Sequence, residues 1–283
     1  MEKTILGLRS ETSIHAGTGQ NTGVVDLPIQ REAHTGWPCV YGSAMKGALR
    51  SHAETRCGNP PWVTDVFGPD TNNASDHAGA IAVTDARLLL LPVRSLTGHF
   101  KWITCPAVLE RLKRDLQMAG KTMAFNIPPA TAGAVVTSSG GTPIFLEEYQ
   151  FNQDQKNIDD LIAALAGFGM DEEQLKQQLA VMHNEDFADF SRTATAVTPH
   201  IAIDNSKKTV LPGALWYEET LPPDTLLYTM LLANPSRNGN GQMEAAAVLG
   251  HVKGMFTGDE IYLQIGGNET VGMGWCRVTE VRS

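Results

Sequence analysis

Residues 42–50 read Gly-Ser-Ala-Met-Lys-Gly-Ala-Leu-Arg, and this stretch predicts the start of a helix. Ser43 is a residue type favoured at a helix N-cap, so we expect the helix to begin there and to run to about Glu54. Lys46 and Arg50 lie four residues apart, which places both cations on one helix face. A helix N-terminus with two such cations can clamp a phosphate backbone without reading bases, although an ordinary surface helix has the same pattern.

A strand and a long glycine-rich segment precede this helix. Residues 4–15 alternate apolar and polar side chains, which predicts a strand. Residues 16–42 predict a loop too rich in glycine to pack, so the carboxylate of Asp26 should be free to orient a 2′-hydroxyl or hold a hydrated Mg²⁺. His15 lies near the base of this loop. The alternative is that Asp26 caps a turn and pairs with Arg31.

The remaining elements predict an α+β protein. The expected elements are an irregular segment at 58–79, a strand at 80–92, a helix at 106–119, an irregular segment at 120–145, two short acidic helices within 158–187, a hairpin at 197–216 with its tip at 204–208, a strand at 226–233 and a helix at 242–256. A strand–loop–helix unit at the front and a strand–helix–strand unit at the back indicate a core of the ferredoxin-like (RRM-like) type, with the other segments as appendages.

A second glycine-rich segment, Gly266-Gly-Asn-Glu-Thr-Val-Gly-Met-Gly274, lies near the C-terminus. It lacks the Gly-Lys-Ser/Thr of a phosphate loop, but its glycines allow another backbone to approach, so it could line the same groove as the first helix. Two other partial matches to known motifs are incomplete. Ser43-Ala-Met-Lys46 stands without the other two elements of serine acyl enzymes, and the glycine spacing at 17–23 does not fit a dinucleotide-binding loop.

Composition narrows the class of protein. The formal net charge is −9, but residues 147–190 hold eleven acidic side chains and two lysines, so the rest of the chain is neutral and local patches must hold any phosphate. The four cysteines form no Cys-x-x-Cys pair, which fits a reduced protein without disulfides or structural zinc. No run approaches the ~20 apolar residues of a membrane span and no signal peptide is evident, so we expect a cytoplasmic protein without a membrane partner.

Four segments in order resemble the RAMP superfamily of CRISPR systems. They are residues 15–19 followed by Val25-Asp-Leu-Pro-Ile-Gln-Arg-Glu32, then 42–50, then Gly213-Ala-Leu-Trp-Tyr-Glu-Glu219, then 266–274. The phrases at 25–32 and 213–219 are similar to the backbone subunit of type III-B (Cmr) effector complexes in particular. Ala44-Met45 departs from the family's usual Ser-Leu, which concerns packing more than chemistry, and the acidic segment 147–190 matches no motif.

The resemblance implies a single RAMP domain over 1–283 with an RRM-like palm at about 1–119 and 213–283. It also implies a β-hairpin thumb at about 197–212, and a helical or irregular insertion at about 120–195 would complete the domain. Copies of the chain would stack along a crRNA, beside a polymerase-like large subunit, a small subunit and end-capping RAMP subunits. The assembly would cut complementary single-stranded target RNA at regular intervals, as a metal-dependent endoribonuclease.

The resemblance also implies roles for single residues. Asp26 would be the residue essential for cleavage and would hold a divalent metal (Mg²⁺ or Mn²⁺), with His15 as a helper. The candidate RNA-binding residues come from the helix start, the second glycine-rich segment and the hairpin: Gly42, Ser43, Lys46, Arg50, Gly266, Gly267, Asn268, Thr270, Ile201, Lys207 and Lys208. Three alternatives stay open: a non-cleaving RNA scaffold of the same fold, the equivalent type III-A backbone subunit, and a small-molecule enzyme, which the overall acidity favours.

Overall fold

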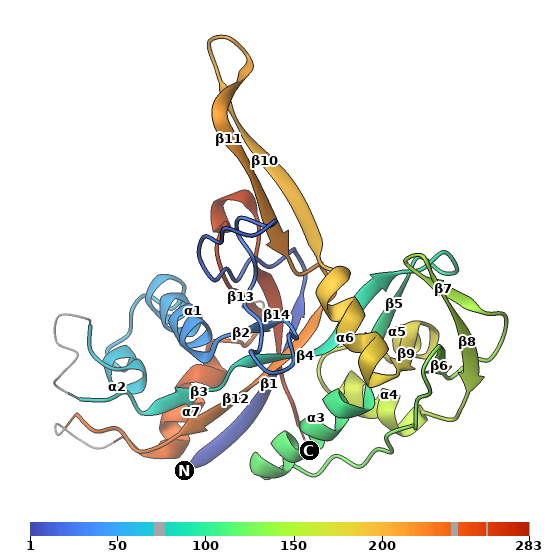
Figure 1. The fold of residues 1–283 in the computed structure, drawn as a ribbon. Coiled ribbons are helices and arrows are strands. Elements are labelled where there is room, and N and C mark those ends of the chain that lie inside the picture. The colour runs from blue at the N-terminus through green and yellow to red at the C-terminus, as the bar shows by residue number, and fades with distance from the viewer. Residues whose placement is uncertain (71–76, 239–242, 259, 283) are drawn as a thin grey trace.

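A large mixed sheet and a separate hairpin organise the protein, seen in a computed structural model that describes residues 1–70, 77–238, 243–258 and 260–282 (Figure 1). Within these residues the sheet has 12 strands, in the order β13-β14-β1-β12-β4-β5-β9-β6-β8-β7, with β2 paired to β4 and β3 to β12. The strands are β1 (Glu2–Ser10), β2 (Cys39–Val40), β3 (Ile81–Val83), β4 (Ala86–Arg94), β5 (Phe100–Thr104), β6 (Ala134–Thr137), β7 (Ile144–Leu146), β8 (Tyr149–Gln155), β9 (Leu179–Met182), β12 (Leu226–Ala233), β13 (Tyr262–Gln264) and β14 (Trp275–Glu280).

The helices of the described residues connect these strands. They are α1 (Gly42–Thr55), α2 (Val63–Phe67), α3 (Pro106–Met118), α4 (Asp159–Ala166), α5 (Glu172–Gln178), α6 (Asn184–Thr193) and α7 (Ala245–Gly254). At the centre, β14, β1, β12 and β4 pair antiparallel in that order. The chain passes from β1 through α1 to β4, and from β12 through α7 to β14, so two strand–helix–strand units interleave. The α+β expectation is confirmed at this level.

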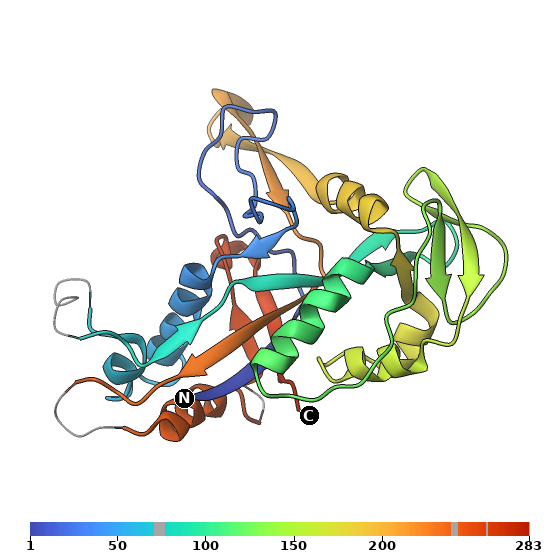
Figure 2. The ribbon, with the colours of Figure 1, turned by 60° about the horizontal axis from the view of Figure 1, so that its bottom comes forward.

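One face of the central sheet carries α3 and the region that follows it. Tyr228, Gly7 and Thr279 are paired side by side across β12, β1 and β14, so their side chains share a face. The Tyr228 hydroxyl donates to Asp115 of α3 at 2.7 Å, and the Thr279 side chain lies against Gly169, between α4 and α5. Figure 2 shows α3 crossing this face.

The opposite face carries α1 and α7. Glu280 follows Thr279 on β14, so its side chain points the other way, and it accepts a hydrogen bond from Lys253 of α7 at 2.7 Å. The ring of His52 in α1 lies 5.2 Å from that of Phe256, just after α7, so the two helices are neighbours. Apolar side chains fill both layers, which is why β1 and β12 are almost continuously buried instead of alternating.

The region 120–195 is more ordered than the sequence predicts. Residues 120–145, predicted irregular, contain β6 and most of β7, and β9 joins the sheet by pairing parallel to β5. The acidic stretch forms three short helices, α4 to α6, where we expected two. Short strands such as Ala134–Thr137 escape prediction because their burial comes from pairing with distant strands.

The hairpin of β10 (Ala196–Asp204) and β11 (Thr209–Thr220) confirms the expectation for 197–216 and projects far from the sheet (Figure 1). At its tip, Asp204 Oδ1 accepts from the backbone N–H groups of Ser206 at 2.9 Å and Lys207 at 3.3 Å, which fixes the turn. Between Ile201 and Ile203 the pairing register shifts, so that residues 211–214 of β11 bulge outward.

The first helix begins one residue earlier than predicted, and Ser43 is not its cap. Tyr41 occupies the N-cap position, and the backbone N–H of Gly42 donates to Asp85 Oδ1 at 2.7 Å. A Cβ atom on Gly42 would lie 2.4 Å from the Val83 carbonyl oxygen, so only glycine fits this crossing. The carboxylate that caps the helix therefore comes from a distant loop, and no local sequence pattern predicts this cap.

Smaller differences concern the ends of elements. The strand predicted at 80–92 is two strands, β3 and β4, which both pair antiparallel with β12 and are separated at Thr84-Asp85. The segment 58–79 contains α2, and its residues 71–76 lie outside the described part of the chain. The helix predicted at 242–256 is α7, with residue 242 also outside. No helix of the described residues is long and apolar enough to cross a membrane.

Candidate functional site

The loop that carries Asp26 is attached to the edge of β11. Leu27 donates its N–H to the Tyr217 carbonyl oxygen and accepts the N–H of Glu219 on its own carbonyl, both at 3.0 Å. The Asp26 carboxylate accepts the Tyr217 N–H through Oδ2 at 2.8 Å. The expectation of an unpacked loop is therefore wrong: Asp26 is half-buried and held by the hairpin. The alternative is wrong as well, because Arg31 pairs with Glu219 instead.

A cavity of about 400 Å³ opens beside Asp26. The loop lines one side of it, and the bulged part of β11 lines the other; the lining residues are Gln20, Asn21, Asp26, Leu27, Gly213, Leu215 and Trp216. The carboxylate has one oxygen bound to backbone, while Oδ1 has no hydrogen bond from the residues that the structure describes. The cavity can therefore admit a polar ligand to a fixed carboxylate.

Trp216 brings a second group to this cavity that the sequence did not reveal. Its ring stacks on the ring of His200 across the hairpin, with centroids 5.5 Å apart and planes at 15°. The Nε2 atom of His200 is buried and lacks a hydrogen-bond partner among the described residues. The pairing of β10 with β11 creates this contact, so only the register of the hairpin could have predicted it.

His15 lies beneath the loop and does not face the cavity. Its Nδ1 is 2.8 Å from the Glu219 carbonyl oxygen, which can only accept, so Nδ1 donates this hydrogen bond. Only 9% of the residue is exposed, and a Cβ atom on Gly17 would lie 2.7 Å from Nε2. The structure thus brings His15 and Asp26 to the same strand, two residues apart along β11, with His15 in a supporting position.

Glu219 is the centre of this arrangement, and no role was predicted for it beyond its place in the 213–219 phrase. Its Oε1 accepts from Arg31 at 2.5 Å and from the Thr195 hydroxyl at 2.6 Å. Its Oε2 accepts the Ile29 N–H at 3.1 Å. With a side chain 7% exposed, this carboxylate is fully satisfied, and it joins the loop, the hairpin and the end of α6.

The second glycine-rich segment supports His15 from the other side. Gly267 donates its N–H to the His15 carbonyl oxygen at 2.8 Å, and a Cβ atom on Gly266 would lie 2.4 Å from that oxygen. Asn268 donates to Glu218 Oε1 at 2.7 Å. Thr270 lies in the exposed 3₁₀ turn Glu269–Val271. The predicted close backbone approach is confirmed, and its partner is the chain itself.

The start of α1 is joined to the same site through Gln30. The Gln30 side chain accepts the Tyr41 N–H at 2.6 Å and donates to the Gly17 carbonyl oxygen at 3.1 Å. Gly42 and the exposed Ser43 follow directly. Lys46 has no ion pair or hydrogen bond within the described residues, and burial, together with the nearby Arg50 charge, lowers its pKa.

Arg50 is not the free cation that the sequence predicts. Its guanidinium binds Glu54 at 2.7 Å, the Gly68 carbonyl oxygen at 2.9 Å, and the carboxylate of Asp70. The partners at 68–70 come from the loop after α2, which the helix spacing alone does not reveal. Arg50 therefore pins that loop to α1, and Lys46 remains as the cation of this helix face that is free to bind phosphate.

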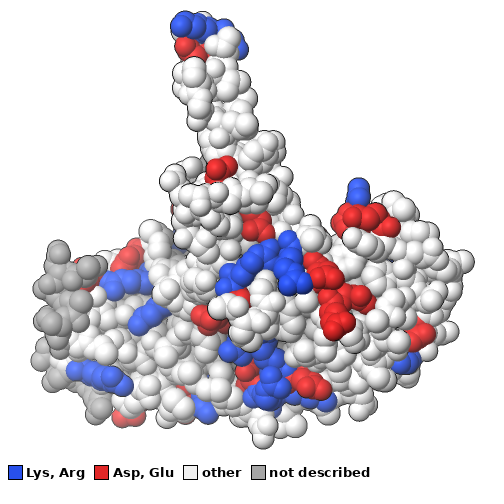
Figure 3. All heavy atoms as spheres, in the orientation of Figure 1, with Lys and Arg blue, Asp and Glu red and all other residues white. Residues whose placement is uncertain are grey.

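The hairpin residues predicted to bind RNA are not among those that line the Asp26 cavity. Ile201 is 48% exposed on the stem, together with Ile203, Val210 and Leu211. Lys207 and Lys208 belong to the turn at the tip, and Figure 3 shows positive charge there above a stem with little charge. The hairpin thus presents an apolar stem and a basic end to solvent.

The residues present fit a divalent ion only in part. The described residues contain no cluster of three or more His, Cys, Asp or Glu side chains that could hold a metal. Asp26 offers a single carboxylate. Mg²⁺ commonly keeps several waters and binds one or two carboxylates plus substrate phosphates, so Asp26 suits a hydrated ion shared with a nucleic acid.

Comparison with known proteins gives consistent results. The profile of the RAMP superfamily matches residues 8–277. The CRISPR system Cmr endoribonuclease Cmr4 of Pyrococcus furiosus is 38% identical over 288 residues, covering 99% of this chain and 96% of that protein. The crystal structure of oligomeric Cmr4 from the same organism superposes with a TM-score of 0.77 at 32% identity, covering 100% and 99% of the two chains. A chain of the type III-B Cmr-beta complex bound to cognate target RNA shares the fold, with a TM-score of 0.78 at 20% identity and coverage of 99% and 98%.

The role of Glu219 in fixing the loop can be tested by hydrogen exchange. Glu219→Gln keeps the size of the side chain but removes the charge that Arg31 and the Ile29 N–H bind. A hydrogen bond to a charged group contributes about 1.5–3 kcal/mol, so we expect the protection of the Leu27 and Ile29 amides to fall roughly 10- to 100-fold. Glu218→Gln is the matched control, because Glu218 binds Asn268 and not the loop. Unchanged protection in Glu219→Gln would contradict this role.

Proposed function

This chain belongs to the RAMP superfamily and to its Cmr4 branch, and we propose that it is the guide-RNA-binding backbone subunit of a type III-B CRISPR effector that cleaves the target RNA. The observation that carries the proposal is the Asp26 carboxylate, fixed by the Tyr217 N–H at the mouth of a cavity between loop and hairpin. Such a group is positioned for chemistry on a polar ligand, and the P. furiosus relative is named an endoribonuclease.

The arrangement of strands supports the palm and thumb of this proposal. In a β-α-β-β-α-β unit, β1 would be the first strand, β4 the second, β12 the third and β14 the fourth. The order of these strands across the sheet is then 4-1-3-2, as in the ferredoxin-like fold. The thumb is the hairpin of β10 and β11, and residues 120–195 are the insertion. The palm would bind the guide, and the thumb would reach toward the paired strands.

The proposed chemistry uses Asp26 directly and its neighbours indirectly. In RNA cleavage a carboxylate can orient the attacking 2′-hydroxyl or accept its proton. The Tyr217 N–H holds the carboxylate in place, and His15 fixes the backbone of Glu219 two residues further along. A divalent ion, Mg²⁺ or Mn²⁺, would be held by Asp26 with water and RNA phosphate oxygens, and would neutralise charge at the phosphate.

The guide backbone would follow the palm from the first turn of α1 to the second glycine-rich segment. Ser43 and Lys46 offer a hydroxyl and an uncommitted cation, beside Gly42, whose own N–H already donates to Asp85. Gly266, Gly267 and Thr270 are exposed on the neighbouring loop. These contacts address phosphate and ribose, so sequence specificity would come from base pairing between guide and target.

The thumb would act on the paired strands by contact with its apolar stem. Ile201 and its exposed neighbours can wedge between stacked bases, while Lys207 and Lys208 at the tip can bind phosphate. One thumb per subunit along a filament would give cuts at regular intervals. Copies of the chain, crRNA, target RNA, a polymerase-like large subunit, a small subunit and end-capping RAMP subunits are the partners proposed, in the cytoplasm.

A non-cleaving scaffold of the same fold is the second candidate. The surroundings of Asp26 favour the nuclease, because a scaffold has no need of a carboxylate fixed at a solvent-accessible cavity. The equivalent type III-A subunit has weaker support, since the P. furiosus relative and the similar solved structures are Cmr proteins.

Replacing Asp26 tests the nuclease directly. Asp26→Asn retains an oxygen that can accept the Tyr217 N–H, so the loop should stay in place while the charge is lost. Loss of such a group typically slows a reaction by about 10²–10⁴-fold, and target binding should be unaffected because base pairing supplies its energy. The measurement is cleavage of a labelled target by complexes assembled with Asp26→Asn subunits, with Mg²⁺ and with EDTA. Glu173→Gln, on an exposed helix, is the control; wild-type rates in Asp26→Asn would support the scaffold instead.

The guide path predicts different effects for the two cations of α1. Lys46→Ala should lower the slope of log affinity against log salt for single-stranded guide RNA by about 0.7, the value for one phosphate contact. Arg50→Ala should lower the melting temperature with little change in that slope, because Arg50 is bound to protein groups. Lys176→Ala, within the acidic helices, serves as the control. An unchanged slope in Lys46→Ala would remove this residue from the RNA path.

A further inference from the structure

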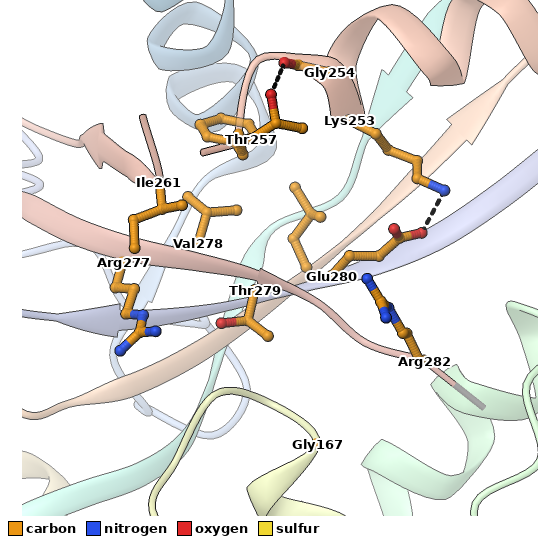
Figure 4. A pocket seen from close by; sticks show the side chains of 12 residues that line it. Gly167, Lys253, Gly254, Thr257, Ile261, Arg277, Val278, Thr279, Glu280 and Arg282 are labelled. Atoms are coloured by element: carbon orange, nitrogen blue, oxygen red, sulfur yellow. Dashed lines mark hydrogen bonds and ion pairs between the residues drawn. The ribbon is translucent and has the colours of Figure 1, made fainter. Parts of the chain in front are cut away.

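A second cavity lies at the other end of the central sheet from Asp26. It has a volume of about 570 Å³ and surrounds the C-terminal half of β14 (Figure 4). The pairing of Leu6 with Glu280 places it beside the middle of β1, whereas His15 and Asp26 follow the end of β1. The proposed RNA contacts do not include any of its lining residues.

The cavity exposes an edge of the sheet. Val281 donates its N–H to the Ile5 carbonyl oxygen at 2.9 Å, so the odd-numbered residues of this part of β14 bond to β1 and the even-numbered ones point away. On the outer side, β13 pairs only as far as Arg277, and Ile261 accepts the Val278 N–H at 2.8 Å. Beyond that point, none of the described residues bonds to the N–H or carbonyl of Glu280.

The cavity reaches both faces of the sheet at this edge, as an added strand requires. On one side the lining is apolar, from Leu6, Phe256, Ile261 and Val278. Figure 4 shows Thr279 and Arg277 on the other side of β14, the side on which Gly167 lies. The side chains of an extended segment alternate between two faces, so an added strand would place every second residue in the apolar groove.

The charged groups at the cavity favour an acidic occupant. Arg277 and Arg282 are exposed, and neither has an ion pair or hydrogen bond within the part of the chain that is described. Lys253 and Glu280 neutralise each other at 2.7 Å. Two guanidinium groups without a partner among the described residues thus flank an edge at which no described residue bonds to the Glu280 backbone, in a protein whose net charge is −9.

We propose that the edge of β14 at Glu280 is a docking site for an extended acidic segment of a partner protein, which adds to the sheet as a strand. Its backbone would bond to the N–H and carbonyl of Glu280, its acidic residues would pair with Arg277 and Arg282, and its apolar residues would enter the groove beside Phe256. Main-chain bonds at a free edge supply affinity in such complexes, and the flanking pockets supply specificity. RNA fits less well, because the Glu280 carboxylate lines the cavity and the groove is mostly aliphatic.

The test uses the full-length protein and a fluorescent probe peptide in which aspartate and valine alternate over eight residues. We expect micromolar binding by fluorescence anisotropy. Two control peptides separate the contributions: one carries lysine in place of aspartate, and the other carries N-methyl groups on alternate amides, which block strand pairing but keep the charge. Both should bind at least about tenfold more weakly.

Protein variants locate the site. Arg277→Glu with Arg282→Glu should weaken binding of the probe by about tenfold or more, whereas Arg237→Glu, an exposed arginine outside the cavity, should leave it unchanged. Equal binding of the N-methylated peptide would overturn the proposal, because charge alone would then explain the affinity. The proposal would also be overturned if the double variant still bound the probe but lost self-association in sedimentation, or still bound the probe but lost crosslinking to RNA. The proposal is independent of the nuclease, so Asp26→Asn should bind the probe normally.

Discussion

The outer edge of β11 near the base of the hairpin needs hydrogen-bond partners, and the loop after β1 supplies them. Ile14 and Leu221 exchange both backbone bonds, and Leu27 bonds to Tyr217 and Glu219. An exposed strand edge in this position would leave polar groups unpaired and invite aggregation. The same pairing fixes Asp26 beside the bulge of β11, so the hydrogen bonds that protect the edge also form the candidate active site. The Glu219 carboxylate strengthens this attachment of the loop to the hairpin, because it binds Arg31, Thr195 and Ile29.

Contacts with the palm also hold the loop at the base of the hairpin. Glu32, one residue after Arg31, forms a buried ion pair with Arg111 of α3 at 2.5 Å, and the ring of Trp37 lies 5.0 Å from the Arg111 guanidinium. Removing one partner of such a pair leaves a charge unsatisfied in the interior, which typically costs about 3–5 kcal/mol. Because α3 also bonds to β12 through Asp115 and Tyr228, the loop, the hairpin base and the sheet are held together through a continuous set of polar contacts.

Sequence patterns predicted the parts whose signals are local. The hairpin, α3 and β12 follow from alternation or helical periodicity, and β12 agrees with its prediction to the residue. The two glycine-rich segments and the Asp26 phrase pointed to the site through family resemblance. What the patterns missed depends on distant partners: the cap of α1 comes from Asp85, Arg50 is bound by the loop at 68–70, and the short strands of the insertion are buried only through pairing. His15 was correctly placed near the site, but its position beneath the loop depends on Glu219, more than two hundred residues away.

One hairpin would therefore have two tasks: its base holds the loop with Asp26, and in the proposed function its stem and tip would set the interval between cuts. The most direct measurement is to map the ends of target fragments produced by complexes whose subunits lack residues 202–209. Because residues 217–221 remain, the loop should stay attached and cleavage should continue, but the fragment ends should lose their regular spacing. Regular spacing equal to that of the wild type would contradict the account, since the hairpin would then play no part in positioning the target.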